Sequence, residues 1–167
     1  GEIPLLLYHI PVFNNGIPGE VASDLLLSGQ AAGIKDSSGN APYFQMLAEA
    51  RRQKEFSLIL GNDNLTRTAL DLGADAIISG CACAVPELSV ALWNAQKQGN
   101  IDEFDRLEAL MNEFISHIEA FPGPYGVREA VDTRGIAVGA RAIPYSPNTE
   151  AKAAEFREWF PAWYPYR

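Results

Sequence analysis

The amino-acid sequence predicts an α/β fold built on a parallel sheet. Four short apolar runs of strand length, each closed by a glycine, a proline or a turn, are separated by segments with helical spacing. Alternation at this spacing is typical of βαβ units, whose strands lie parallel. Hydrophobic residues make up 47% of the 167 residues and charged residues 20%, which excludes a disordered chain and allows a sizeable core.

The first two strands are expected within the first forty residues. Residues 5–10 form a continuous apolar run that ends at a proline, and a run this short indicates a strand buried on both faces. Residues 20–27 predict a short helix. Residues 31–35 predict the second strand, and residues 36–40 form a turn rich in residues that begin helices.

The next two strands also alternate with predicted helices. Residues 41–54 alternate apolar and charged positions as an amphipathic helix does, and residues 56–60 predict the third strand. Residues 65–72 predict a helix capped by a glycine, and residues 76–79 predict the fourth strand. A helix over residues 86–98 begins with a proline in its first turn.

After the fourth unit the strand patterns stop. Residues 100–120 predict a long helix with Asn100 as its N-cap, and residues 124–133 and 149–160 predict further helices. The aromatic run over residues 159–166 is expected to pack against this helical layer, with a subunit contact as the alternative. No segment has the composition of a linker. We therefore expect one domain over 1–167, with four βα units in 1–98 and a C-terminal helical extension in 99–167.

Charge and cysteine content narrow the function classes. Lys and Arg number 13 against 21 Asp and Glu, a net charge of −8, which disfavours nucleic acid and anionic membranes as partners. No apolar run approaches the roughly 20 residues that span a bilayer, and no signal peptide is recognisable. Cys81 and Cys83 are expected to be small buried thiols in a reducing, cytoplasmic setting, since only two histidines accompany them and a zinc site needs about four ligands. No metal site is therefore expected.

Lys35 is the sharpest chemical candidate. It ends a strand of small and apolar residues, where loss of water would favour a neutral amine that can form a Schiff base with a carbonyl. The alternative is a lysine at a solvent-facing strand end, paired with Asp36. Tyr8 ends the neighbouring strand and can pass protons beside a forming iminium, or it can be a core tyrosine bonded to backbone. Sites in parallel α/β folds assemble at these carboxyl ends of strands.

Four further residues close strands three and four. Gly61 would let a ligand approach the backbone, and Asp63 would accept a substrate hydroxyl or merely cap a helix. Ile78 and Ser79 occupy the corresponding place after the fourth strand. Neither a G-x-S-x-G elbow nor a G-x-x-x-x-G-K phosphate loop is present around Ser37.

Several of these segments resemble motifs of the dihydrodipicolinate synthase and N-acetylneuraminate lyase superfamily. Tyr8-His9-Ile10-Pro11 resembles its Tyr-Asn-x-Pro strand, and residues 33–40, Gly-Ile-Lys-Asp-Ser-Ser-Gly-Asn, resemble its Schiff-base lysine motif. Residues 60–63 and 73–80 look like its next two strand ends. The resemblance extends over nearly the whole chain.

The resemblance implies a (β/α)8 barrel of TIM type, of which this chain would hold only the second half. It implies that Lys35 condenses with pyruvate or another 2-keto acid, that Tyr8 relays protons, and that Gly61 and Ile78 line the pocket through backbone atoms. It implies no cofactor. Such a half-barrel leaves two sheet edges and an apolar face open, so we expect a truncated chain that pairs with another copy or with a missing N-terminal half.

Two positions depart from the family pattern. Phe13 stands where dihydrodipicolinate synthases have an arginine that holds the second substrate's carboxylate, which favours a lyase or aldolase acting on a 2-keto-3-deoxy acid over lysine biosynthesis. His9 replaces the usual asparagine. The competing hypotheses are a true dihydrodipicolinate synthase, a non-catalytic α/β scaffold module, and a phosphosugar-binding half-barrel, which is disfavoured because no basic residue follows the strand-closing glycines directly.

Overall fold

The computed structural model describes residues 3–164, so the last residues of the predicted aromatic run, Pro165 and Tyr166, lie outside the described part. The chain divides into two compact units, with the boundary between Ser79 and Gly80 in the sequence. Residues 86–98, which were expected to belong with the four βα units, fall in the same unit as the C-terminal helices. The expectation that residues 1–167 form one domain stays a prediction.

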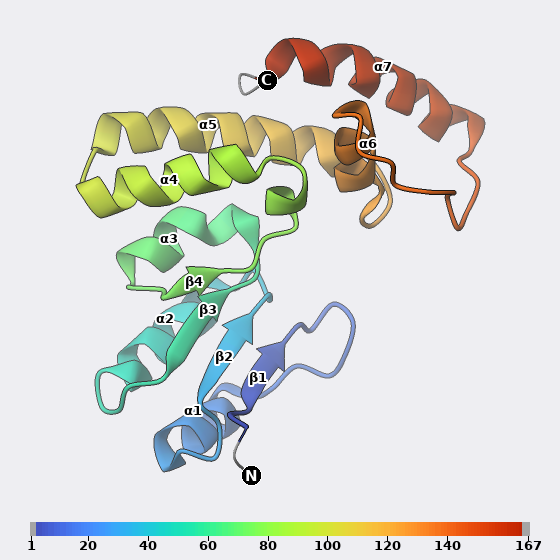
Figure 1. Cartoon of the computed structure of the whole chain (residues 1–167). Helices are drawn as coiled ribbons and strands as arrows, with labels where there is room; N and C mark the ends of the chain where they lie inside the picture. Colours follow the sequence, from blue (N-terminus) through green and yellow to red (C-terminus); the bar gives the residue numbers. More distant parts are fainter. Residues whose placement is uncertain (1–2, 165–167) are drawn as a thin grey trace. The chain divides into compact units, whose positions relative to one another are not determined.

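The first unit is a four-stranded parallel sheet in the order β1-β2-β3-β4 (Figure 1). The strands are β1 (Leu6–His9), β2 (Gly33–Asp36), β3 (Ser57–Leu60) and β4 (Ala76–Ile77). Between them run α1 (Gly19–Ser28), α2 (Ala41–Arg51), the short 3-10 turn η1 (Asp63–Leu65) and α3 (Thr66–Asp71). The four predicted strands and the helices between them are confirmed, with ends that differ by at most three residues.

The two faces of this sheet differ in burial. Ile34, Leu58 and Leu60 are fully buried against apolar side chains of α1 and α2 such as Leu26 and Phe44. Because neighbouring residues of a strand point to opposite faces, the other face carries the alternate positions of each strand. That second face holds the cross-strand row Tyr8, Lys35, Ile59 and Ala76.

The prediction that the first strand is buried on both faces is wrong. Leu6 and Tyr8 are 52% and 48% exposed, whereas His9, on the helix side, is 6% exposed. The physical reason is position: β1 is an edge strand with β2 as its single strand neighbour in the sheet, and its other face carries no covering layer among the described residues. A continuous apolar run shows that a strand is hydrophobic, but it does not show which of the two faces of the strand are covered.

The second unit is helical. It contains a 3-10 turn η2 (Cys81–Cys83) and helices α4 (Pro86–Gln98), α5 (Ile101–Ile118), α6 (Tyr125–Thr133) and α7 (Pro147–Trp163). Asn100 caps α5 as predicted, since its side chain accepts the Glu103 N–H at 3.2 Å. Cys81 is buried but Cys83 is exposed, which corrects the expectation of two buried thiols.

The described part of the aromatic run packs within this unit, as predicted. Along α7 the ring of Phe160 stacks on Phe156 and Tyr164, and the ring of Trp163 stacks on Phe114 of α5. This packing carries the helix through Pro161 to Trp163, three residues beyond its predicted end. In the described part of the chain no helix has the length and apolarity that crossing a membrane requires.

Candidate active site

Lys35 and Tyr8 meet on the exposed face of the sheet. The two residues are register partners on neighbouring strands, so their side chains leave the sheet side by side. Lys35 Nζ donates a hydrogen bond to Tyr8 Oη at 3.2 Å and lies 4.3 Å from the centroid of the phenol ring. An amine and a phenol are therefore within proton-transfer distance at the carboxyl ends of β1 and β2.

The sheet geometry excludes two alternatives from the sequence, a Lys35 paired with Asp36 and a Tyr8 buried in the core. Asp36 is fully buried on the helix side, and its Oδ1 accepts the Ser38 N–H at 2.9 Å, so it closes the turn after β2 and does not face the Lys35 amine. Tyr8 is not a core tyrosine. Its hydroxyl faces Lys35 and its side chain is half-exposed. Lys35 itself is half-buried, and thus less withdrawn from water than the sequence suggested.

The amine changes the acidity of its neighbour. The hydrogen bond from Lys35 holds the pKa of Tyr8 below its usual value, and the hydroxyl of Ser37 adds to this effect. Burial opposes the change, and the positive charge of Lys35 supports it. A phenol with a lowered pKa gives up its proton more readily near neutral pH, which suits a group that passes protons to and from a reacting carbon or nitrogen.

Gly61 completes the geometry around the lysine. A Cβ atom at this position would lie 2.0 Å from Ser37 Oγ and 2.5 Å from Lys35 Cε. The backbone of Gly61 is fixed by its N–H, which donates to the Asp36 carbonyl at 2.7 Å. A side chain at this position would therefore force the lysine and serine side chains to move.

Ser37 is a site residue that the sequence reasoning missed. Its hydroxyl is buried beside the phenol of Tyr8 and against Gly61. The signal was present in the spacing, since a residue two positions after Lys35 leaves the end of a strand on the same face.

The remaining predicted residues lie at the same edge of the sheet without a demonstrated role. Asp63 begins the 3-10 turn after β3, and its carbonyl accepts from the Thr66 hydroxyl at 2.8 Å. Ile78 and Ser79 follow directly after β4, and Ile78 is 53% exposed. The structure thus brings together Lys35, Tyr8 and Gly61, and a contact of the other three with substrate stays a prediction.

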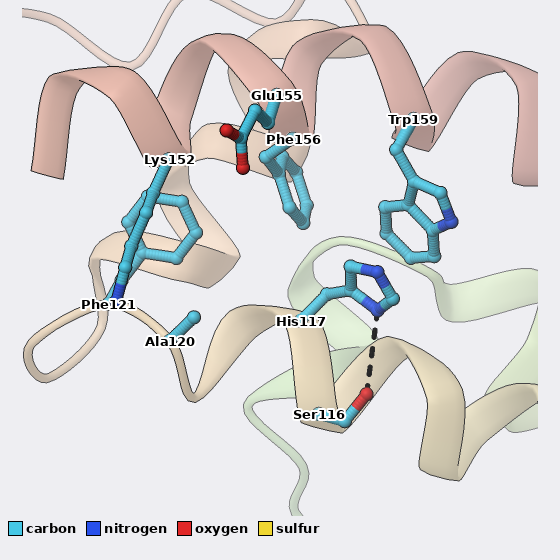
Figure 2. Close-up of a pocket in the computed structure, with 8 residues that line it drawn as sticks. All are labelled: Ser116, His117, Ala120, Phe121, Lys152, Glu155, Phe156 and Trp159. Carbon is cyan, nitrogen blue, oxygen red and sulfur yellow. Dashed lines mark hydrogen bonds between the residues drawn. The ribbon is translucent and has the colours of Figure 1, made fainter. Parts of the chain in front are cut away.

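A hollow of about 370 Å³ lies in the second unit, between α5 and α7. Figure 2 shows its lining, in which the imidazole of His117 lies flat against the indole of Trp159 with ring centroids 3.6 Å apart. The other lining residues are Ser116, Ala120, Phe121, Lys152, Glu155 and Phe156. It contains none of the predicted site residues.

Comparison with known proteins places this arrangement in a family. The family model described as "Dihydrodipicolinate synthetase family" matches residues 1–162. A 4-hydroxy-tetrahydrodipicolinate synthase of Methanosphaerula palustris is 26% identical over 158 residues, which are 94% of this chain and 54% of that protein. The chain spans about half the length of the curated relatives it matches.

Solved structures agree with the fold. The dihydrodipicolinate synthase of Bacteroides thetaiotaomicron superposes with a TM-score of 0.76 at 26% identity, over 94% of this chain and 55% of that one. YagE, a prophage protein of Escherichia coli K12 crystallised with pyruvate, superposes with a TM-score of 0.83 at 21% identity, over 98% of this chain and 57% of that one. The parallel sheet and its helices are therefore part of a (β/α) barrel of TIM type, as the sequence predicted, and the chain belongs to the dihydrodipicolinate synthetase family.

Proposed function

We propose that this chain carries the Schiff-base half of a carbon–carbon lyase or aldolase acting on pyruvate or a related 2-keto acid. Lys35 is the nucleophile and Tyr8 is the proton relay. The observation that carries the proposal is the 3.2 Å contact between the Lys35 amine and the Tyr8 hydroxyl at the carboxyl ends of two parallel strands. A scaffold module would not need an exposed amine and phenol to meet at this edge.

The chemistry follows from these two groups. The neutral amine of Lys35 attacks the keto carbon, and the carbinolamine that forms loses water to give an iminium. In cleavage, the iminium nitrogen accepts the electron pair of the bond between C3 and C4 of the keto acid, which leaves an enamine. In synthesis, the iminium first loses a proton from C3 to the deprotonated Tyr8 oxygen, and the enamine that results attacks an aldehyde to form that bond. Tyr8 supplies the proton that leaves with hydroxide as water, and it takes up the proton that an alcohol releases when the bond breaks.

The second substrate is proposed to differ from that of a true dihydrodipicolinate synthase. Phe13, in the loop after β1, is 82% exposed and cannot pair with a carboxylate. No Lys or Arg occurs between Ile10 and Pro18 or between Ser37 and Asn40, in the loops that follow β1 and β2. We therefore favour an uncharged aldehyde partner, as cleavage of a 2-keto-3-deoxy acid would give, with Asp63 as the proposed contact for a hydroxyl group.

The open face of the sheet is proposed to be covered in the active protein. Leu6 and Ile78 are more than half exposed on the face or edge that carries Lys35. We propose pairing with a second copy or with a segment like the one that fills the remaining length of the relatives. Sedimentation equilibrium distinguishes the two coverings, because it measures the mass of the chain in solution. A dimer is expected if a second copy covers the face, and a monomer if the further segment is required.

Borohydride reduction with pyruvate tests the proposed function. Wild-type protein is expected to gain one reduced pyruvate, and peptide mass spectrometry is expected to place it on the peptide that contains Lys35. The assignment is simple, because the sequence has only four lysines: Lys35, Lys54, Lys97 and Lys152. A folded protein that takes up no pyruvate would favour the scaffold module instead.

Gly61→Ala is expected to lower the initial rate of pyruvate trapping by at least about tenfold, because an oriented nucleophile loses this much when displaced by about 1 Å. The added methyl group would overlap Ser37 Oγ and Lys35 Cε, so the lysine must move. The matched control is Gly80→Ala, where the backbone is right-handed helical and a Cβ meets no atom within 4 Å. Equal rates for the two variants would show that the glycine does not shape the lysine pocket.

A further inference from the structure

His9 and Tyr43 hold the backbone of a single residue, Ile17, from both sides. The Ile17 N–H donates to His9 Nδ1 at 2.9 Å, and the Tyr43 hydroxyl donates to the Ile17 carbonyl at 3.0 Å. The imidazole and phenol rings stack on each other, with centroids 4.2 Å apart and planes 16° from parallel. His9 is 6% exposed, so this clamp is buried.

The clamp connects three elements next to the candidate site. His9 is the last residue of β1 and follows Tyr8, and Tyr43 lies in α2. Ile17 lies near the end of the loop between β1 and α1. Residues 11–16 of that loop are exposed. Its backbone nevertheless approaches the imidazole closely, because a Cβ at Gly16 would lie 2.9 Å from His9 Cε1. Since β1 is an edge strand, the clamp adds a side-chain anchor to the end of the strand that presents Tyr8.

The tautomer of His9 is fixed by this contact. A backbone N–H can only donate, so Nδ1 must carry a lone pair, and a neutral ring then carries its proton on Nε2. A protonated ring has a proton on both nitrogens and cannot accept the Ile17 N–H. The clamp therefore requires the neutral ring with its lone pair on Nδ1.

Among the described residues, two titratable side chains lie beside His9. Tyr43, from α2, is its stacking partner. Burial together with the negative charge of Asp36 raises the pKa of Tyr43 to about 12, so its hydroxyl stays a hydrogen-bond donor at neutral pH. Asp36, from β2, is the register partner of His9 on the same face and is fully buried.

We propose that His9 is a positioning residue whose neutral ring clamps the loop between β1 and α1 and holds Tyr8 against Lys35. The clamp stands on the contacts above, and its effect on catalysis rests on the proposed function. Asparagine is the informative replacement, because its Oδ1 lies close to the position of Nδ1 and can accept the same N–H.

Hydrogen exchange of the Ile17 amide, measured by NMR and corrected for the intrinsic rate, tests the clamp. Wild-type protein is expected to protect this amide, and His9→Leu is expected to lose about tenfold of that protection. His9→Asn is expected to keep the protection. The Gly61 amide, which donates to the Asp36 carbonyl, is the internal reference. Protection of the Ile17 amide in His9→Leu equal to that in wild type would overturn the clamp.

Tyr43→Phe gives a second, milder variant in case His9→Leu does not fold. It keeps the stacked ring and removes only the hydrogen bond to the Ile17 carbonyl, so Ile17 protection is expected to fall severalfold. Unchanged protection in this variant would contradict the two-sided clamp.

The rate of pyruvate trapping measures separately whether His9 positions Tyr8 against Lys35. We expect His9→Leu to trap pyruvate severalfold more slowly than wild type and His9→Asn to recover most of that loss; equal rates would refute the positioning role. A wild-type protein that traps no pyruvate would refute the proposed function. The clamp would then be tested only by the hydrogen exchange of the Ile17 amide.

Discussion

A Lys35→Ala variant is expected to take up no pyruvate when borohydride is added, under conditions in which wild-type protein is labelled. The reason is chemical, because an iminium needs a primary amine at the site, and Lys35 is the lysine whose amine meets Tyr8. The expected loss is complete, since alanine leaves no group that can replace the nucleophile. Intact-mass spectrometry of the reduced protein gives the result directly.

The loss is expected without unfolding. Lys35 is half-buried on the exposed face of the sheet, and its removal deletes one hydrogen bond worth about 1 kcal/mol. Circular dichroism checks that the variant keeps its secondary structure. Lys97→Arg is the control, because Lys97 is an exposed lysine at the end of α4 that lies over the Trp93 ring, and this variant is expected to be labelled like wild type. Labelling of Lys35→Ala at another lysine would show that the trapped amine is not the one proposed.

Glu129→Gln is expected to destabilise the helical unit by about 3 kcal/mol, the lower end of what loss of one partner costs a buried ion pair. Glu129 is 2% exposed. It accepts hydrogen bonds from Arg157 at 2.6 Å, Arg141 at 2.9 Å and Tyr145 at 3.0 Å. The neutral amide would leave the two guanidinium groups without their shared buried carboxylate.

Urea unfolding followed by tryptophan fluorescence measures this effect, because all three tryptophans lie after Gly80 and report on this unit. The matched control is Glu150→Gln. Glu150 contacts the same Arg141 at 2.6 Å but is about half exposed, so its removal is expected to cost less than about 1 kcal/mol. Equal shifts for the two variants would mean that burial of Glu129 does not set the strength of the network.

The same network predicts loss of stability in acid. Burial raises the pKa of Glu129, but Tyr145, Arg157 and Arg141 outweigh it, and the pKa lies below its usual value. A carboxyl group with a lowered folded-state pKa contributes stability that is fully present above its unfolded pKa of about 4.3 and is lost as pH falls through the folded value. The wild-type unit is therefore expected to lose stability below about pH 4, and Glu129→Gln to lose less over the same range.

Much of the fold was predictable because it depends on local patterns. The four apolar runs, the glycines that close them and the Asn100 cap are set by residues close together in the chain, and the structure confirms them. Lys35 and Tyr8 were predictable for a related reason, since carboxyl ends of parallel strands share one edge of a sheet. Register then made them neighbours, 27 residues apart in sequence.

Burial and close packing were not predictable from the same patterns. The hydrophobic run of β1 is identical whether one or both of its faces are covered, and only the sheet order shows it to be an edge strand. Ser37 lies against Gly61 of the next strand end, and His9 accepts a hydrogen bond from Ile17 of the following loop. No local spacing in the sequence encodes these two contacts. The sequence alone determined which segments form strands and that Tyr8 and Lys35 stand near the ends of two of them, because these features depend on neighbours along the chain. Only the tertiary structure decided which faces are open and which side chains hold the site in place, because these depend on contacts between distant segments.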